Sequence, residues 1–508
     1  MTYPNPPTSA QAPRAPRPAA GPRRKRAKGM GLRGQGAIAA AFFSVILAMF
    51  SPTPGVVLAA GGALAALFLL MWRPGEPPIL MFPLLYQWSV VAVKPYLSAF
   101  RHIPVNDLAQ YGGNLEKAAY FAFAAIVCIA IGIRLTVGKL KRNWTAELDA
   151  EVRALPLNRV LLVTGALVAI GVLMNALAMI VAPLRSALLV LGGFGAGGVF
   201  FLAYWCFKNQ RGYLYLVALM IAEIGVGLTG FFSDFQIPIL LLCVAALCAR
   251  DRLNLGDALV LTLVITVLLV VASFWSEVKQ DYRKFMNGGT GAQVILVSLD
   301  DRIDYLGDQI KTFNAARLGD GFEILLRRHS YIDFLANTMD YVPVFTPHEH
   351  GKRIGRTVIH VLTPRILFPD KPPTDFDTEV TIRYTGIALT VYAGTSISIG
   401  YLGELYIDFG IVGALIACLI AGTGIGYGWR ILRDSGRGSL LLRFGLYSLL
   451  ALTLTQFGFA LIKLVGGSLT AFIGAHLAQR FVLPSGSKLL RPKRPAPKIA
   501  TAPLPRAG

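Results

Sequence analysis

The sequence predicts an all-α polytopic membrane protein with about twelve transmembrane helices, one large external loop domain and both termini on the cytoplasmic side. The chain has 508 residues, of which 54% are hydrophobic and 15% charged, and its mean hydropathy is +0.56. These values are too apolar for an ordinary soluble enzyme. Apolar runs of about 18 or more residues recur, which is the length a helix needs to cross about 30 Å of hydrocarbon.

Much of the net charge of +21 lies in two Pro/Ala-rich tails. Residues 1–36 hold eight Lys or Arg and residues 488–508 hold six, with no acid in either segment. Such segments cannot form a core, and basic tails beside membrane helices are expected on the cytoplasmic side. We therefore interpret residues 1–36 and 483–508 as disordered basic tails. The charge pattern argues against nucleic-acid binding and favours contact with the lipid bilayer.

A membrane domain of about nine helices is predicted over residues 37–275. The basic clusters at 139–142, 208–211 and 250–252 fall on the cytoplasmic side, in the alternation that the positive-inside rule requires. The expected spans are residues 37–50, 55–72, 79–93, 117–137, 159–181, 186–207, 213–231, 235–249 and 258–275.

An external loop domain is predicted over residues 276–399, because no segment there is long and apolar enough to span. Its 14 Lys/Arg are matched by 15 Asp/Glu, so it does not violate the charge rule. Amphipathic helices are expected at about 294–316 and 322–339. Three further spans, at 400–429, 440–461 and 465–481, form a second membrane domain over 400–482 and return the chain to the cytoplasmic side.

The segment from Lys352 to Gly410 carries the strongest chemical signal. Five cations lie within about thirty residues of one another: Arg353, Arg356, Arg365, Lys371 and Arg383. A guanidinium fork fits phosphate oxygens bidentately, so these residues are candidates for binding a diphosphate. Prolines at 363–373 would present Arg365 and Lys371 on a rigid loop. The alternative is pairing with nearby acids on a solvated face.

Three acids and one histidine are candidates for proton transfer or pairing. Glu404 and Asp408 are four residues apart, so they share one face at the mouth of a membrane helix, where acids are costly. Either could act as a general base or pair with the loop arginines. His360 could accept a proton from a hydroxyl, or could be a structural hydrogen-bonding residue. Glu223 lies within an apolar run and is a further buried-acid candidate.

With these residues the chain resembles the bacterial O-antigen and exopolysaccharide repeat-unit polymerases, the Wzy-type family, and the related O-antigen ligases. The resemblance rests on the helix count, the large loop before the last spans, and two motifs. These are ProArg–x3–ProAspLysPro at 364–372 and GlyGluLeuTyrIleAspPheGly at 403–410. An Arg-x10-Gly pattern of some members fits Arg383–Gly394 and Arg101–Gly112.

The resemblance implies a glycosyltransferase of the bacterial inner membrane whose active site faces the periplasm. Its substrate would be an undecaprenyl-diphosphate-linked oligosaccharide, passed onto the next lipid-linked repeat unit without a cofactor or metal. Arg365, Lys371 and Arg383 would hold the diphosphate, with Arg356 and Arg101 assisting, and His360 or Glu404 would activate the acceptor. A chain-length regulator and a flippase are possible partners. A ligase, or a flippase or transporter without enzymatic activity, are the alternatives.

Overall fold

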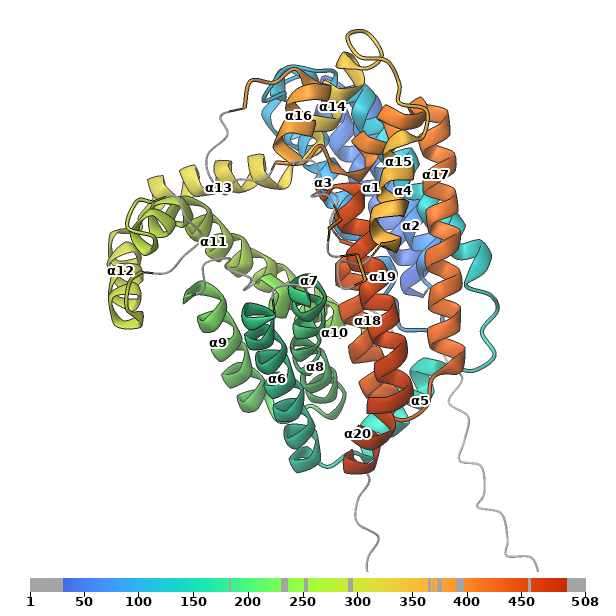
Figure 1. Cartoon of the computed structure of the whole chain (residues 1–508), viewed down its shortest axis with the longest axis vertical. Helices are drawn as coiled ribbons and strands as arrows, with labels where there is room; N and C mark the ends of the chain where they lie inside the picture. Colours follow the sequence, from blue (N-terminus) through green and yellow to red (C-terminus); the bar gives the residue numbers. More distant parts are fainter. Residues whose placement is uncertain are drawn as a thin grey trace, which may run out of the picture.

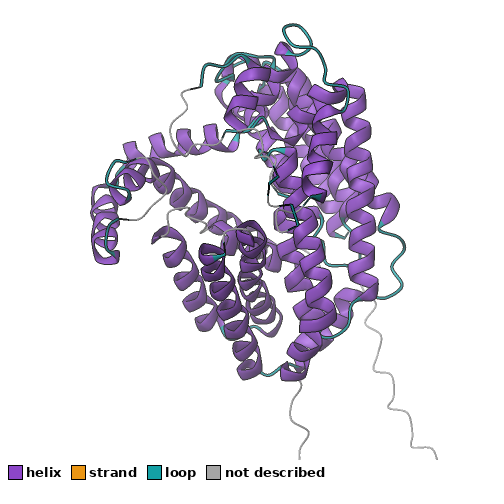
Figure 2. Cartoon of the chain, viewed as in Figure 1, coloured by secondary structure: helices purple, strands orange, loops and turns teal. Residues whose placement is uncertain are grey.

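The computed structural model describes residues 31–181, 184–229, 236–250, 255–290, 296–363, 367–368, 370–371, 377–389, 397–455 and 458–490. Within these ranges every regular element is helical and no strand occurs, so the predicted all-α class is confirmed (Figure 2). Of the expected disordered tails, residues 1–30 and 491–508 lie outside the described part. The expectation is wrong for the residues next to the membrane domain, because α1 begins at Leu32 and Leu483–Leu490 form a helix.

The N-terminal helices form a compact group. They are α1 (Leu32–Phe50), α2 (Pro54–Met71), α3 (Met81–Arg101) and α4 (Leu115–Thr136), with the short 3-10 helix η1 (Val105–Leu108) between α3 and α4. Small residues let α1 and α2 approach closely, since a Cβ on Gly61 would lie 2.3 Å from the side chain of Ser44. Close contact through small residues is typical of helix packing in lipid.

A second group of helices follows α5 (Trp144–Ala154). It comprises α6 (Leu157–Ile180), α7 (Arg185–Gly192), η3 (Gly193–Ala196), α8 (Gly197–Asn209), α9 (Tyr213–Thr229) and α10 (Gln236–Ala249). The single helix expected at 186–207 is interrupted by η3. Residues 192–198, GlyGlyPheGlyAlaGlyGly, explain the break, because consecutive glycines destabilise a regular helix.

An arm of three helices leaves this second group and leads back to α3 (Figure 1). Helix α11 (Leu255–Met286) has 32 residues and extends well past the span expected at 258–275, and it is followed by α12 (Leu299–Thr312) and α13 (Ala315–His329). A small separate core of Trp275, Val278, Tyr282 and Met286 supports the arm. The helix expected at 322–339 is divided, since α13 ends at His329.

The remaining helices of residues 276–399 pack onto both the N-terminal group and the C-terminal helices. Helix α14 (Ile332–Tyr341) contacts α4 and α16 (Asp377–Thr385), and α15 (Lys352–Leu362) packs against two C-terminal helices, α17 (Gly400–Ser435) and α19 (Leu461–Leu477). In Figure 1, α14, α15 and α16 lie at the end of the molecule opposite α5 and α20 (Leu483–Leu490).

The C-terminal helices complete the bundle. Helix α18 (Leu440–Thr453) contacts α8 and α19, and α19 continues through the π-helical turn η4 (Ala478–Val482) into α20. Helix α17 packs along α4, where a Cβ on Gly422 would lie 2.2 Å from the carbonyl oxygen of Ile129. Glycine is therefore required at this backbone contact.

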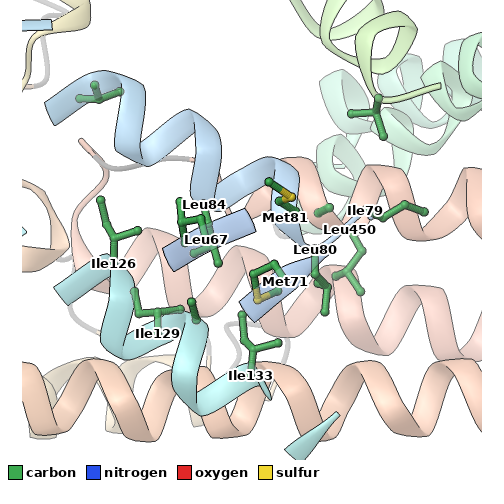
Figure 3. Close-up of a cluster of buried hydrophobic side chains, with 14 of the residues drawn as sticks. Leu67, Met71, Ile79, Leu80, Met81, Leu84, Ile126, Ile129, Ile133 and Leu450 are labelled. Atoms are coloured by element: carbon green, nitrogen blue, oxygen red, sulfur yellow. The ribbon is translucent and has the colours of Figure 1, made fainter. Parts of the chain in front are cut away.

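The main core lies among α2, α3, α4 and α18, where Figure 3 shows Leu67, Leu84, Ile126 and Leu450. Six helices or continuous helical stretches of the described chain are long and apolar enough to cross a membrane: Arg33–Phe50, Pro54–Met71, Leu115–Thr136, Leu157–Ala178, Gly400–Ser435 and Leu461–Leu490. Shorter apolar helices occur at Tyr213–Gly225, Ile237–Ala249 and Leu440–Thr453.

Candidate functional site

A cavity of about 310 Å³ lies between α15, α16, α17 and the start of α19. It brings together three cations, an imidazole and two carboxylates: Arg353, Arg356, Lys371, His360, Asp377 and Glu404. Its volume is at the lower end of the range of about 300–1,000 Å³ found for small-molecule sites. Five of these six residues were singled out as site candidates from the sequence.

Helix α15 supplies most of the polar wall. Arg353, Arg356 and His360 follow the i, i+3, i+7 spacing of one helical face, and all three line the cavity. Val358 and Leu362 lie on the opposite face and are 46% and 66% exposed. The helix therefore turns its charged face inward and its apolar face outward, the reverse of a helix on a water-soluble protein.

Asp408 fixes the N-terminus of α15. The backbone N–H groups of Arg353 and Ile354 donate to its two carboxylate oxygens, at 3.1 and 2.8 Å. Gly351 at the N-cap has no side chain to accept these bonds, and a carboxylate is also favoured there by the helix dipole. Asp408 is 1% exposed and does not line the cavity, so its contacts assign it a positioning role.

Glu404 ties three helices together. One of its oxygens accepts from the guanidinium of Arg353 at 3.0 Å, and the other accepts from the backbone N–H of Leu461, the first residue of α19, at 3.0 Å. The side chain is nearly fully buried. Both oxygens are thus engaged, which corresponds to the pairing alternative for this acid.

The conformation of α17 presents both acids to α15. Gly410 interrupts the helix with φ 65° and ψ −169°, a backbone conformation that is essentially restricted to glycine. The kink separates a short segment that carries Glu404 and Asp408 from the longer apolar segment that follows. Every residue from Gly400 to Asp408 is buried.

Arg353 remains charged although it is largely buried. Burial lowers the pKa of its guanidinium, but the negative charge of Glu404 outweighs this effect, and the net pKa is raised. The guanidinium also lies 5.3 Å from the centre of the Tyr384 ring, a cation–π geometry. Its Nε is buried and makes no hydrogen bond within the described part of the chain.

Arg356 and Lys371 provide the accessible cations of the cavity. Arg356 is exposed and makes no hydrogen bond or ion pair with any residue that the structure describes. Lys371 donates to the main-chain carbonyl of His360, which holds the Lys371 side chain against the end of α15. An anion entering the cavity would meet a guanidinium that has no competing partner.

Sequence reasoning did not select Asp377 or Lys463 as site residues. Asp377 begins α16 and forms an ion pair with Lys463 of α19, and Asp377 lines the cavity. In the sequence, Asp377 was visible only as an acid near the arginines. Lys463 lies 86 positions further along the chain, so no local pattern could indicate the pair.

Three other predicted residues, Arg101, Arg383 and Glu223, do not line the cavity. Arg101 forms an exposed ion pair with Glu323, joining α3 to α13. Arg383 is exposed on α16, and Glu223 is half-buried on α9; neither lines the cavity. Arg365 lies outside the described residues, as does Gly394 of the Arg-x10-Gly pattern.

The arrangement can bind a phosphate-bearing group beside an imidazole. Arg356 and Lys371 can supply charge-assisted hydrogen bonds, and an imidazole such as that of His360 is the side chain best suited to exchange a proton near neutral pH. Among the described residues, no group of three or more His, Cys, Asp or Glu could hold a metal ion. No family model, no curated protein and no solved structure matches the chain.

Proposed function

We propose that the protein is a polysaccharide repeat-unit polymerase, a glycosyltransferase that acts on polyprenyl-diphosphate-linked glycans. The observation that carries the proposal is Arg356, a guanidinium without a partner among the described residues, in a cavity whose walls include two helices long and apolar enough to span a membrane. A diphosphate at a membrane surface needs cations of this kind. Lys371 and the Arg353–Glu404 pair complete the wall around it.

The apolar outer face of α15 supports a substrate that arrives from the bilayer. Val358 and Leu362 of α15 are 46% and 66% exposed, Leu367 and Phe368 just after it are 71% and 49% exposed, and α15 packs against α17 and α19. Such side chains are stable in contact with lipid rather than water. A lipid-linked substrate would place its tail among them and its diphosphate in the cavity.

The proposed topology has about twelve spans. These spans comprise the six helical stretches long enough to cross a membrane and the three shorter apolar helices. The others are α3, α7 together with α8, and α11. The basic segment 139–142 precedes α5, which lies at the end opposite α14–α16 (Figure 1). The positive-inside rule then puts the α5 end in the cytoplasm and the cavity at the periplasmic face of the inner membrane.

The proposed reaction transfers the donor glycan to a sugar hydroxyl of a second lipid-linked repeat unit. The hydroxyl oxygen forms a bond to the anomeric carbon, while the bond from that carbon to the diphosphate oxygen breaks and the diphosphate leaves with the electron pair. Arg356 and Lys371 stabilise the charge on the leaving group. His360 accepts the hydroxyl proton, because both oxygens of Glu404 are already engaged.

Reconstitution tests the proposal. Purified protein in liposomes that contain only undecaprenyl-diphosphate-linked repeat units should produce a ladder of longer glycans, detected after release from the lipid. A chain-length regulator and a flippase are proposed partners in the cell and are not needed for this assay. Transfer only when a lipid A core acceptor is added would indicate a ligase. Movement of the lipid across the bilayer without elongation would indicate a transporter.

A further inference from the structure

A second cavity, of about 410 Å³, adjoins the first. Asp377 and Ser398 line both cavities, so they form a shared wall. The remaining walls come from α3, α13, the residue before α14, the segment before α19 and the first turn of α19. The proposed reaction joins two glycans, so a second site beside the donor site requires an explanation.

Aromatic rings make up much of this second cavity. Tyr86, Tyr331 and Phe459 line it, and Phe459 is 45% exposed. The Tyr331 hydroxyl is engaged with the backbone of Ser398, as acceptor from its N–H at 3.0 Å and as donor to its carbonyl. Tyr331 would therefore contact a ligand through its aromatic ring and not through its hydroxyl. Aromatic faces of this kind pack against the C–H faces of sugar rings.

His329 contributes a neutral polar surface. Burial lowers the pKa of its imidazole to about 4, so the ring is uncharged near neutral pH. Its Nε2 lies 3.0 Å from the hydroxyl of Ser89, and the ring meets Tyr86 edge-on with centroids 5.6 Å apart. The histidine is thus fixed in place and adds no charge to the cavity.

The charged residues that line the second cavity are Arg328, Lys463 and Asp377. Arg328 makes no hydrogen bond or ion pair with any described residue. Burial, and to a smaller extent the like charge of Arg283, lowers the pKa of its guanidinium. Lys463 forms the ion pair with Asp377 at the shared wall and is about half exposed. A guanidinium that no described residue pairs with, in a cavity lined by aromatic rings, suits a carboxylate-bearing sugar.

We propose that the second cavity binds an acidic sugar residue of the acceptor glycan, with the ring on the aromatic side chains and its carboxylate on Arg328. The inference rests on the proposed function and names its acceptor site. The acceptor hydroxyl would reach the first cavity past Asp377. A neutral sugar would use the rings alone and bind more weakly.

Binding of a soluble saccharide tests this inference without requiring polymerisation. The full-length protein in nanodiscs is titrated with a glucuronic-acid disaccharide and with the matching glucose disaccharide, by calorimetry. The wild type should bind the glucuronic-acid disaccharide about tenfold more tightly than the glucose disaccharide, because a charge-assisted hydrogen bond contributes about this much. Arg328→Gln should bind the two disaccharides equally. Arg327→Gln changes an exposed neighbour on the same helix that does not line the cavity, and should bind like the wild type.

Three outcomes would overturn the inference. The first is that the wild type binds the acidic and neutral probes with equal affinity, and the second is that it binds neither. The third is that Arg328→Gln and Arg327→Gln lose affinity for the acidic probe to the same extent. A cooperative thermal unfolding transition, measured for each variant and compared with that of the wild type, serves as the control for correct folding. Arg356→Gln separates the two proposals, because it should impair chain elongation and leave saccharide binding unchanged.

Discussion

Glu404 and Arg353 show how a buried ion pair organises the candidate site. Glu404 joins α17 to Arg353 on α15 and to the N-terminus of α19, and both side chains are largely buried. Removing two charges from water costs free energy, and only the attraction between the two partners offsets this cost. The pair is therefore important for the geometry of the cavity, because it holds the Glu404 carboxylate and the Arg353 guanidinium in place in its wall.

Removing one partner of this pair should destabilise the protein. We expect Glu404→Ala to lower the free energy of unfolding by about 3–5 kcal/mol, because it leaves the guanidinium of Arg353 buried without its counter-charge. The double substitution Glu404→Leu with Arg353→Met should recover part of the loss. Thermal unfolding in detergent measures both; equal stability of Glu404→Ala and the wild type would contradict the role assigned to the pair.

Helix α17 depends on two kinds of glycine. Gly410 produces the kink that presents Glu404 and Asp408 to α15. Further along, Gly132 of α4 and Gly422 of α17 allow the two backbones to touch. Lipid tails are as apolar as a leucine side chain, so helices in a bilayer are held by close packing and not by the burial of apolar area. The α4–α17 contact is thus a main determinant of the bundle.

A pair of alanine substitutions tests this contact. Gly422→Ala should lower the melting temperature, because the new methyl group would lie 2.2 Å from the carbonyl oxygen of Ile129. Gly424→Ala is the matched control on the same helix, since its new methyl group would have no neighbouring atom within 4 Å, and it should melt like the wild type. A larger loss of stability in Gly424→Ala than in Gly422→Ala would contradict the packing described.

Taken as a whole, the molecule has α14 and α16 at the end opposite α5 and α20 (Figure 1), and the charged cavity lies between α15, α16, α17 and the start of α19. The all-helical architecture follows from the apolar runs, and most expected spans correspond to a helix within a few residues. The predicted helix boundaries are wrong where tertiary packing or the local backbone determines where a helix breaks or ends. Seven residues that include five glycines break the expected helix at 186–207, and α11 runs on for a further three turns.

The candidate site was predictable where its residues share one helix. Arg353, Arg356 and His360 lie close in the sequence and lie on one face of α15. The separation of Arg356 from Arg383 was not predictable, because it depends on how α15 and α16 turn against α17 and α19. The Asp377–Lys463 pair joins distant parts of the chain, and only the packed structure brings them together.

The central claim is that Arg356 binds the diphosphate of a lipid-linked glycan, and elongation in liposomes by one pair of variants tests it most directly. Charge-assisted hydrogen bonds contribute about 1.5–3 kcal/mol, so Arg356→Gln should slow ladder formation by about ten- to a hundredfold. Lys352→Gln removes an exposed cation of the same helix that does not line the cavity, and should elongate at the wild-type rate. An unchanged ladder with Arg356→Gln would contradict the proposed site.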